Sequence, residues 1–175
     1  MTTTVLPSAL RVADCSRCQG LCCVAPAFDA DQGFGHDKPA HRACHHLDAE
    51  FRCCIHERLD AEGYAGCAAY DCHGAGPQLL ARCGATPWSA LRDPAPLFDA
   101  FLQQRRLHEM LMLLDLALPQ AAELAADLAR LRERVEQAAA GAPADAAALR
   151  DELDALLPRL RKLRERPAPP SPPGC

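Results

Sequence analysis

Thiols dominate the first half of this 175-residue chain. Ten of its 11 cysteines and six of its seven histidines lie between Cys15 and Cys83. The cluster begins with Cys15, Cys18, Cys22 and Cys23. The C-x2-C step from Cys15 to Cys18 lets two sulfurs reach one metal ion without strain. Cysteines at this density either form disulfides or bind metal.

The start of the chain favours metal. Residues 1–7 contain neither the basic nor the apolar segment of a signal peptide. No apolar run approaches the roughly 20 residues that span a bilayer. We therefore expect a cytoplasmic protein without a membrane partner, whose thiols stay reduced. The net charge of -4 argues against a nucleic-acid partner. A secreted, disulfide-braced interaction domain is the alternative that we expect least.

The remaining thiols complete a candidate ligand set. The later candidates are Cys44, Cys53 or Cys54, Cys67 and Cys72. Eight thiolates could build two four-ligand sites or one multinuclear cluster. Zinc accepts mixed cysteine and histidine shells, whereas iron–sulfur clusters prefer thiolates. The reserve ligands are His45, His46, His56 and His73. Adjacent side chains diverge, so the pair Cys22-Cys23 either serves two nearby ions or has one member that packs as a small apolar residue.

Other polar residues have plainer interpretations. We expect His36 and His41 to be surface residues, and His108 to be exposed or at an interface. Glu57 and Asp71 are interpreted as solvated carboxylates rather than acid–base groups. The chain shows no phosphate-binding glycine loop. We therefore expect a binding protein rather than an enzyme.

Composition divides the chain into four parts. Residues 1–86 form the cysteine-rich module, 87–96 a linker, 97–166 a helical region and 167–175 a proline-rich tail that is extended or disordered. The module shows little helical periodicity and no strand pattern. If residues 13–23 are helical, the first three cysteines share one face. Shorter helices are predicted near residues 55–62 and 78–82.

The helical region predicts three helices. Apolar residues recur every three or four positions over residues 97–118, 119–140 and 144–166. Pro119 is well placed as a first helical residue, whereas Pro158 should kink or split the third helix. Short connections favour a helical hairpin or three-helix bundle. The fold class is therefore mainly α, and the Leu-rich stripes could also serve a protein partner or self-association.

The cysteine motifs resemble a known family. They are Cys15-x2-Cys18-x3-Cys22-Cys23, Cys44-His45-His46-Leu47, Phe51-Arg52-Cys53-Cys54-Ile55-His56, Gly66-Cys67 and Tyr70-Asp71-Cys72. They look like the YkgJ-type cysteine-cluster family of zinc- or iron-chelating domains. The closer similarity, through Gly33-Phe34-Gly35 and Gly63-Tyr64-Ala65-Gly66, is to a cysteine module with a helical segment that precedes pentapeptide repeats in some bacterial proteins. No such repeats follow here, and His56 stands where the family tends to have Tyr.

The resemblance implies a ligand set and little about a reaction. The implied metal ligands are Cys15, Cys18, Cys22, Cys23, Cys44, Cys53, Cys67 and Cys72. The cysteines left over are Cys54, Cys83 and Cys175. A distantly related flagellin lysine methylase carries an iron–sulfur cluster, so an iron–sulfur protein with a redox or methyl-transfer role is the alternative. Our main hypothesis is zinc or iron chelation in a structural, storage or partner-binding role.

Overall fold

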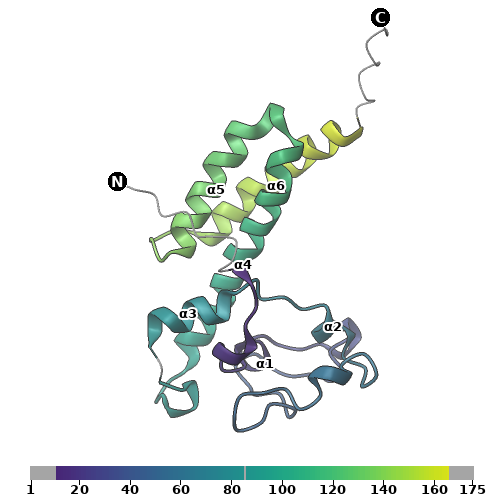
Figure 1. The fold of residues 1–175 in the computed structure, drawn as a ribbon, viewed down its shortest axis with the longest axis vertical. Helices are drawn as coiled ribbons and strands as arrows, with labels where there is room; N and C mark the ends of the chain where they lie inside the picture. Colours follow the sequence, from purple (N-terminus) through teal and green to yellow (C-terminus); the bar gives the residue numbers. More distant parts are fainter. Residues whose placement is uncertain (1–10, 85, 166–175) are drawn as a thin grey trace, which may run out of the picture. The chain divides into compact units, whose positions relative to one another are not determined.

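Helices are the main secondary structure of the described residues, although turns and loops make up much of the first half of the chain. The computed structural model describes residues 11–84 and 86–165. The α-helices are α1 (Leu21–Val24), α2 (Ala65–Ala68), α3 (Ala75–Cys83), α4 (Ala95–Ala117), α5 (Ala125–Ala139) and α6 (Ala146–Glu165) (Figure 1). The described residues contain no β-strand, only two isolated bridges, Phe28 with Lys38 and Leu47 with Cys53. The predicted mainly α fold is confirmed.

Six single turns of 3-10 helix complete the secondary structure of the described residues. They are η2 (Cys15–Arg17), η3 (Ala30–Gln32), η4 (His56–Arg58), η5 (Trp88–Ala90), η6 (Leu118–Gln120) and η7 (Ala122–Leu124). The chain forms two compact units, Met1–Glu109 and Met110–Cys175, which divide within α4. The predicted tail, residues 167–175, lies outside the described residues.

A small apolar core organises the first unit. It joins α1, α3 and the start of α4, and includes Leu21, Val24, Leu79, Phe98 and Phe101. The first turn of α3 lies directly against η2, because a Cβ at Gly76 would stand 2.8 Å from the Cβ of Cys18. Only glycine therefore permits this close approach, which fixes the first C-x2-C step on the core.

The predicted helix over residues 13–23 is wrong. The segment forms two short pieces, η2 and α1, separated by a left-handed turn at Gln19 (φ 51°) and Gly20 (φ 63°). Left-handed backbone cannot continue a right-handed helix. The helix predicted near residues 55–62 is likewise shorter than expected and consists of the single turn η4. Most of this unit is thus turn and loop.

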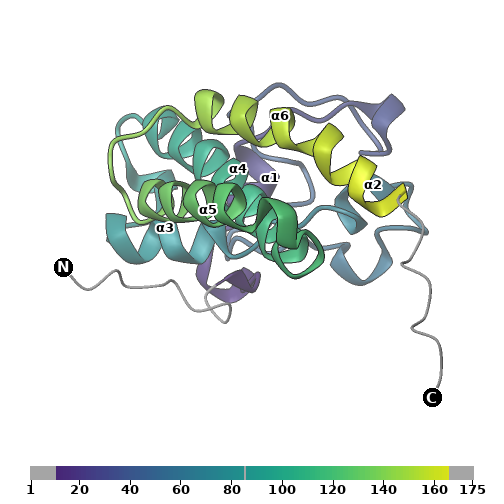
Figure 2. The same cartoon turned by 90° about the horizontal axis from the view of Figure 1, so that it is seen from above.

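The second unit is a conventional helical assembly. Helices α5 and α6 pack against each other and run side by side in both ribbon views (Figures 1 and 2). Arg132 of α5 also pairs with Asp115 of α4, with Nε 2.5 Å from Oδ1. The buried seam consists of Leu111, Leu114, Leu124, Leu128, Leu131, Val135, Leu149, Leu153 and Leu156. Each fully buried Leu contributes about 1.5–3 kcal/mol to folding.

Two prolines affect this unit differently from the expectation. Pro119 is the second residue of a 3-10 turn, η6, and the next α-helix starts only at Ala125. Pro158 lies inside α6, which runs unbroken from Ala146 to Glu165, so the predicted split does not occur. No helix in residues 11–84 and 86–165 is long and apolar enough to cross a membrane.

Candidate metal centre

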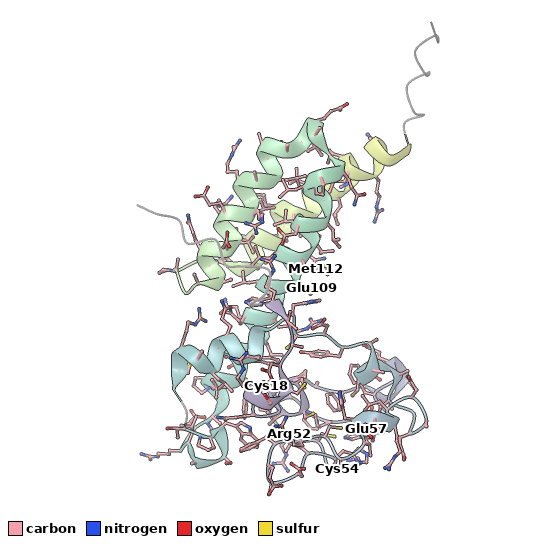
Figure 3. All side chains as sticks on the ribbon, viewed as in Figure 1. Cys18, Arg52, Cys54, Glu57, Glu109 and Met112 are labelled. Atoms are coloured by element: carbon pink, nitrogen blue, oxygen red, sulfur yellow. The ribbon has the colours of Figure 1, made fainter. Side chains whose placement is uncertain are left out.

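Every cysteine in the described part of the chain is a free thiol. All ten, from Cys15 to Cys83, lack a disulfide partner. Cys54 and Cys83 are exposed, whereas Cys18 and Cys44 are buried. The described residues therefore give no support to the disulfide-braced alternative. Figure 3 shows Cys18 in the interior of the first unit and Cys54 near its edge.

Seven of the eight predicted ligands line one cavity. Its volume is about 260 Å³, and loops far apart in the sequence supply its wall. The cysteines on the wall are Cys15, Cys18, Cys22, Cys23, Cys44, Cys53 and Cys67. The eighth predicted ligand, Cys72, packs beside Cys22 against the core of the first unit. The loops thus bring seven of the eight predicted ligands to one cavity.

One group of thiols surrounds the first C-x2-C step. Asp14 caps η2 by accepting the backbone N–H of Ser16 at 3.0 Å, which holds the turn carrying Cys15. Burial, followed by the neighbouring Cys22 and Cys72 sulfurs, raises the pKa of Cys15. Burial and Cys22 raise the pKa of Cys18 to about 12. Cys22 and Cys72 thus contribute to the raised pKa of both Cys15 and Cys18, and these four cysteines are called the first thiol group.

A second thiol group comes from later loops. The Cys44 N–H donates to the Cys23 carbonyl oxygen at 2.9 Å, which holds these residues together. Cys53 follows in a bridge with Leu47. Cys67 lies on α2, and burial followed by Cys44, Cys22 and Cys53 raises its pKa to about 11. Cys23, Cys44, Cys53 and Cys67 form the second thiol group.

The vicinal pair joins the two groups. The Sγ atoms of Cys22 and Cys23 lie 3.9 Å apart. The contact with Cys23, together with burial, raises the pKa of Cys22 well above its ordinary value. The Cys22 thiol is consequently protonated at neutral pH in the metal-free protein, and a bound cation would have to displace that proton.

The sulfurs are spread around the cavity and do not converge on the position of a single ion. Tetrahedral zinc with four Zn–S bonds of about 2.3 Å requires sulfurs about 3.8 Å apart. Among the described residues, no three cysteine Sγ atoms all lie within 4.8 Å of one another. The donor set suits zinc or iron chemically, but this arrangement leaves room for more than one small ion.

An orphaned hydroxyl also faces this cavity. Tyr70 lines the cavity, and its buried Oη has no hydrogen-bond partner among the described residues. Burial, partly offset by Arg105, raises the pKa of Tyr70, so the phenol stays a hydrogen-bond donor. A buried donor without an acceptor is costly. A thiolate-rich centre in the cavity would supply that acceptor, so the residues fit a bound metal.

A buried lysine provides positive charge beside the second group. The Lys38 side chain is 5% exposed, and its Nζ donates to the carbonyl oxygens of Val24, Pro26 and Pro39 at 3.3, 2.5 and 3.2 Å. Burial lowers the pKa of Lys38, and the nearby Cys44 and Cys23 sulfurs oppose that shift. The ammonium can therefore offset part of a thiolate charge. Sequence reasoning assigned no role to Lys38.

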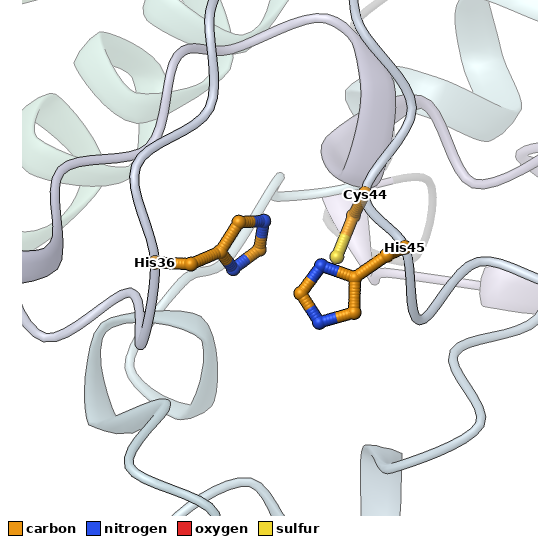
Figure 4. Close-up of side chains that lie close together, drawn as sticks. All are labelled: His36, Cys44 and His45. Atoms are coloured by element: carbon orange, nitrogen blue, oxygen red, sulfur yellow. The ribbon is translucent and has the colours of Figure 1, made fainter.

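Two of the predicted reserve ligands, His46 and His56, line the thiol cavity, whereas other histidines do not lie where we expected. His36 is part-buried, not a surface residue, and its Nδ1 lies 3.0 Å from the Tyr64 hydroxyl. His46 Nε2 contacts the same hydroxyl at 3.0 Å. His36, Cys44 and His45 offer ligand atoms that all lie within 4.8 Å of one another (Figure 4). Of the reserve ligands, only His45 belongs to this set, whereas His73 pairs with Asp71 at 3.5 Å.

His108 also departs from its predicted position. Its side chain is completely buried, and its Nδ1 donates to the carbonyl oxygen of His73 at 2.6 Å. Burial lowers the pKa of His108, so the ring stays neutral. Arg105, three residues earlier on α4, stacks on Tyr70 and donates to the Asp71 carbonyl oxygen at 3.2 Å. Helix α4 thereby holds both sides of Cys72.

The candidate acid–base groups remain at the surface. Glu57 and Asp71 are exposed. Asp71 Oδ1 accepts the backbone N–H of His73 at 2.6 Å, which is a local turn contact. Neither carboxylate lines the thiol cavity. Their positions therefore do not support an acid–base role for these two residues.

Comparison with known proteins finds a similar sequence in one bacterial protein. No protein-family model and no solved structure matches the chain. The chain is 38% identical over 108 residues to the uncharacterized protein YybG of Bacillus subtilis (strain 168). That match covers 61% of the chain and 39% of the relative. The chain thus spans about two fifths of the length of this relative, whose name states no activity.

Proposed function

We propose that the first unit is a metal-binding module that chelates zinc or iron through cysteine thiolates. The observation that carries the proposal is the shared cavity, where seven predicted ligands from separate loops meet as free thiols. The orphaned Tyr70 hydroxyl and the buried Lys38 ammonium support it, because both favour an anionic thiolate centre beside them. The motif resemblance to zinc- or iron-chelating domains points the same way.

In this proposal the eight thiols form two sets of four. Cys15, Cys18, Cys22 and Cys72 would hold one ion, and Cys23, Cys44, Cys53 and Cys67 the other. Cys22 and Cys23 lie one on each side of the division, which respects the divergence of adjacent side chains. When bound, the metal supplies folding free energy to a unit whose apolar core is small. A structural role, with the helices as scaffold or partner surface, follows.

Metal analysis of the full chain purified without oxygen tests this proposal. We expect about two zinc or iron ions per chain and none of the sulfide of a cluster. Cys22→Ser should lower the metal content, whereas Cys83→Ser should leave it unchanged because Cys83 is exposed and outside both groups. A folded, reduced protein without metal would contradict the proposal.

An iron–sulfur centre is the second candidate. The spacing of the sulfurs favours it, since they are further apart than a single zinc ion requires. Cys22, Cys23 and Tyr70 would then border a cluster instead of two separate ions. This candidate predicts a brown protein with absorption near ~400 nm and acid-labile sulfide. A colourless anaerobic preparation with stoichiometric zinc would exclude it.

A further inference from the structure

Three metal-ligating side chains meet beside the thiol cavity. The ligand atoms of His36, Cys44 and His45 all lie within 4.8 Å of one another. Figure 4 shows both imidazole rings turned toward the space beside the Cys44 sulfur. Cys44 lines the thiol cavity, whereas neither His36 nor His45 does. The two rings therefore approach the Cys44 sulfur from outside the cavity, and His45 is exposed to solvent.

A second layer of contacts holds this set in place. The Tyr64 hydroxyl lies 3.0 Å from His36 Nδ1 and 3.0 Å from His46 Nε2. When Nδ1 of His36 donates to this oxygen, the lone pair of Nε2 is available for a ligand. Such a partner on the far ring nitrogen is typical of metal-binding histidines. A Cβ at Gly35 would stand 2.5 Å from the Tyr64 ring, so glycine there lets the ring pack closely.

We propose that His36, Cys44 and His45 form a further metal site, outside the thiol cavity, that binds one divalent ion of borderline character such as zinc. Two imidazoles and one thiolate are ligands that zinc accepts, and three protein ligands leave a coordination position open. The ion shares only the Cys44 sulfur with the proposed thiolate centre. Because His45 is exposed, this ion exchanges with solvent faster than metal enclosed by the cavity.

Cobalt titration of the full chain, purified without oxygen and still holding its resident metal, tests the site. Co²⁺ is added in competition with a chelator, and resident metal is measured in parallel. Wild type should bind one Co²⁺ beyond its resident metal, with a sulfur-to-cobalt absorption band. His36→Ala and His45→Ala should each weaken this binding at least about tenfold while resident metal is retained. Tyr64→Phe, which removes only the hydroxyl, should weaken it by about tenfold.

A matched histidine outside the set is the control. His41 pairs with Asp99 at 3.0 Å and has a left-handed backbone (φ 63°), which Asn tolerates. His41→Asn should leave the added cobalt unchanged. Equal cobalt binding in wild type, His36→Ala and His45→Ala would overturn the proposal, as would loss of resident metal in these variants, because the site would then not be separate. Wild type without resident metal would instead overturn the proposed function.

Discussion

The two units of this protein are stabilised in different ways. The helical unit buries a continuous Leu seam, and ion pairs such as Arg134 with Glu152 lie on its surface. The first unit has two small apolar clusters, and much of its chain runs in turns fixed by single hydrogen bonds. Where the helical unit has leucines, the first unit has thiols around a cavity.

This difference teaches which part of the sequence tolerates change. In a Leu seam a single substitution lowers stability only in part, because each residue contributes a share of one apolar interface. A metal site behaves differently, because the loss of one ligand removes most of its affinity for the metal. Lys38 and Tyr70 belong with the metal site. The charge of Lys38 lies near Cys44 and Cys23, and Tyr70 lines the thiol cavity. The following experiments separate the two modes of stabilisation.

Metal removal should have the largest effect and should be confined to the first unit. Structural zinc contributes about 10–16 kcal/mol to small domains. We expect a strong chelator under reducing conditions to abolish amide protection in the first unit while α5 and α6 keep theirs. Hydrogen exchange measured region by region checks this. Equal loss of protection in both units would break the comparison.

Metal affinity should rise steeply with pH. The pKa of Cys18 is about 12 and that of Cys67 about 11, so both thiols are protonated at pH 7 without metal. A metal bound by four thiolates then releases about four protons, which strengthens binding by about 5 kcal/mol per pH unit and weakens it equally as pH falls. Proton release in weak buffer during zinc addition measures this. Release of no protons at pH 7 would show that the thiols are not ligands.

A cavity in the Leu seam should destabilise only the helical unit. Leu128 is fully buried, so Leu128→Ala should lower the free energy of unfolding by about 2–5 kcal/mol. Metal content should stay at the wild-type value. Urea unfolding followed by circular dichroism, with Leu116→Ala as the exposed control, gives the difference. A loss of metal in Leu128→Ala would mean that the two units are not independent.

Removal of the buried Lys38 ammonium should lower the free energy of unfolding by less than the Leu128→Ala substitution. Lys38→Met keeps the aliphatic stem but abandons three carbonyl acceptors, and we expect a loss of about 2–3 kcal/mol in the metal-loaded protein. The other lysine, Lys162, is exposed, and Lys162→Met should be neutral. Urea unfolding of both variants provides the test. Equal stability of the two variants would show that the buried Lys38 ammonium does not stabilise the first unit.

The smallest effect should come from a surface ion pair of the helical unit. Arg134 contacts Glu152 across α5 and α6, and both side chains are largely exposed. Glu152→Gln should lower the free energy of unfolding by about 0.2–1 kcal/mol, and by less at high salt. Thermal unfolding at two salt concentrations measures this. A larger cost than that of Leu128→Ala would show that charge, not apolar burial, stabilises this unit.

Periodicity allowed the helical region to be predicted well. The three-to-four-residue recurrence gave α4 and α6 to within two residues at each end, because burial of one stripe is what stabilises such helices. It placed the start of α5 wrongly, since Pro119 suits the first turn of a 3-10 helix as readily as that of an α-helix. Pro158 did not divide α6.

Spacing in the first unit predicted which residues meet, but not how. The C-x2-C spacing indicated Cys15 and Cys18 as a metal-binding pair. The family resemblance implied the full set of eight, seven of which line the cavity. The helix expected over residues 13–23 is interrupted at Gln19 and Gly20 by a left-handed turn. Tertiary packing, not local sequence periodicity, determines that turn. The positions of His36 and His108 could not be foreseen either. Each contacts residues at least 28 positions away, through turns that carry no periodic signal.

X-ray absorption at the metal edge of the anaerobically purified full chain, after a mild chelator has removed exchangeable ions, tests the central claim most directly. Thiolate ligation predicts a first shell of sulfur alone, at about 2.3 Å if the metal is zinc. A first shell of oxygen or nitrogen, or a preparation that retains no metal, would contradict the account.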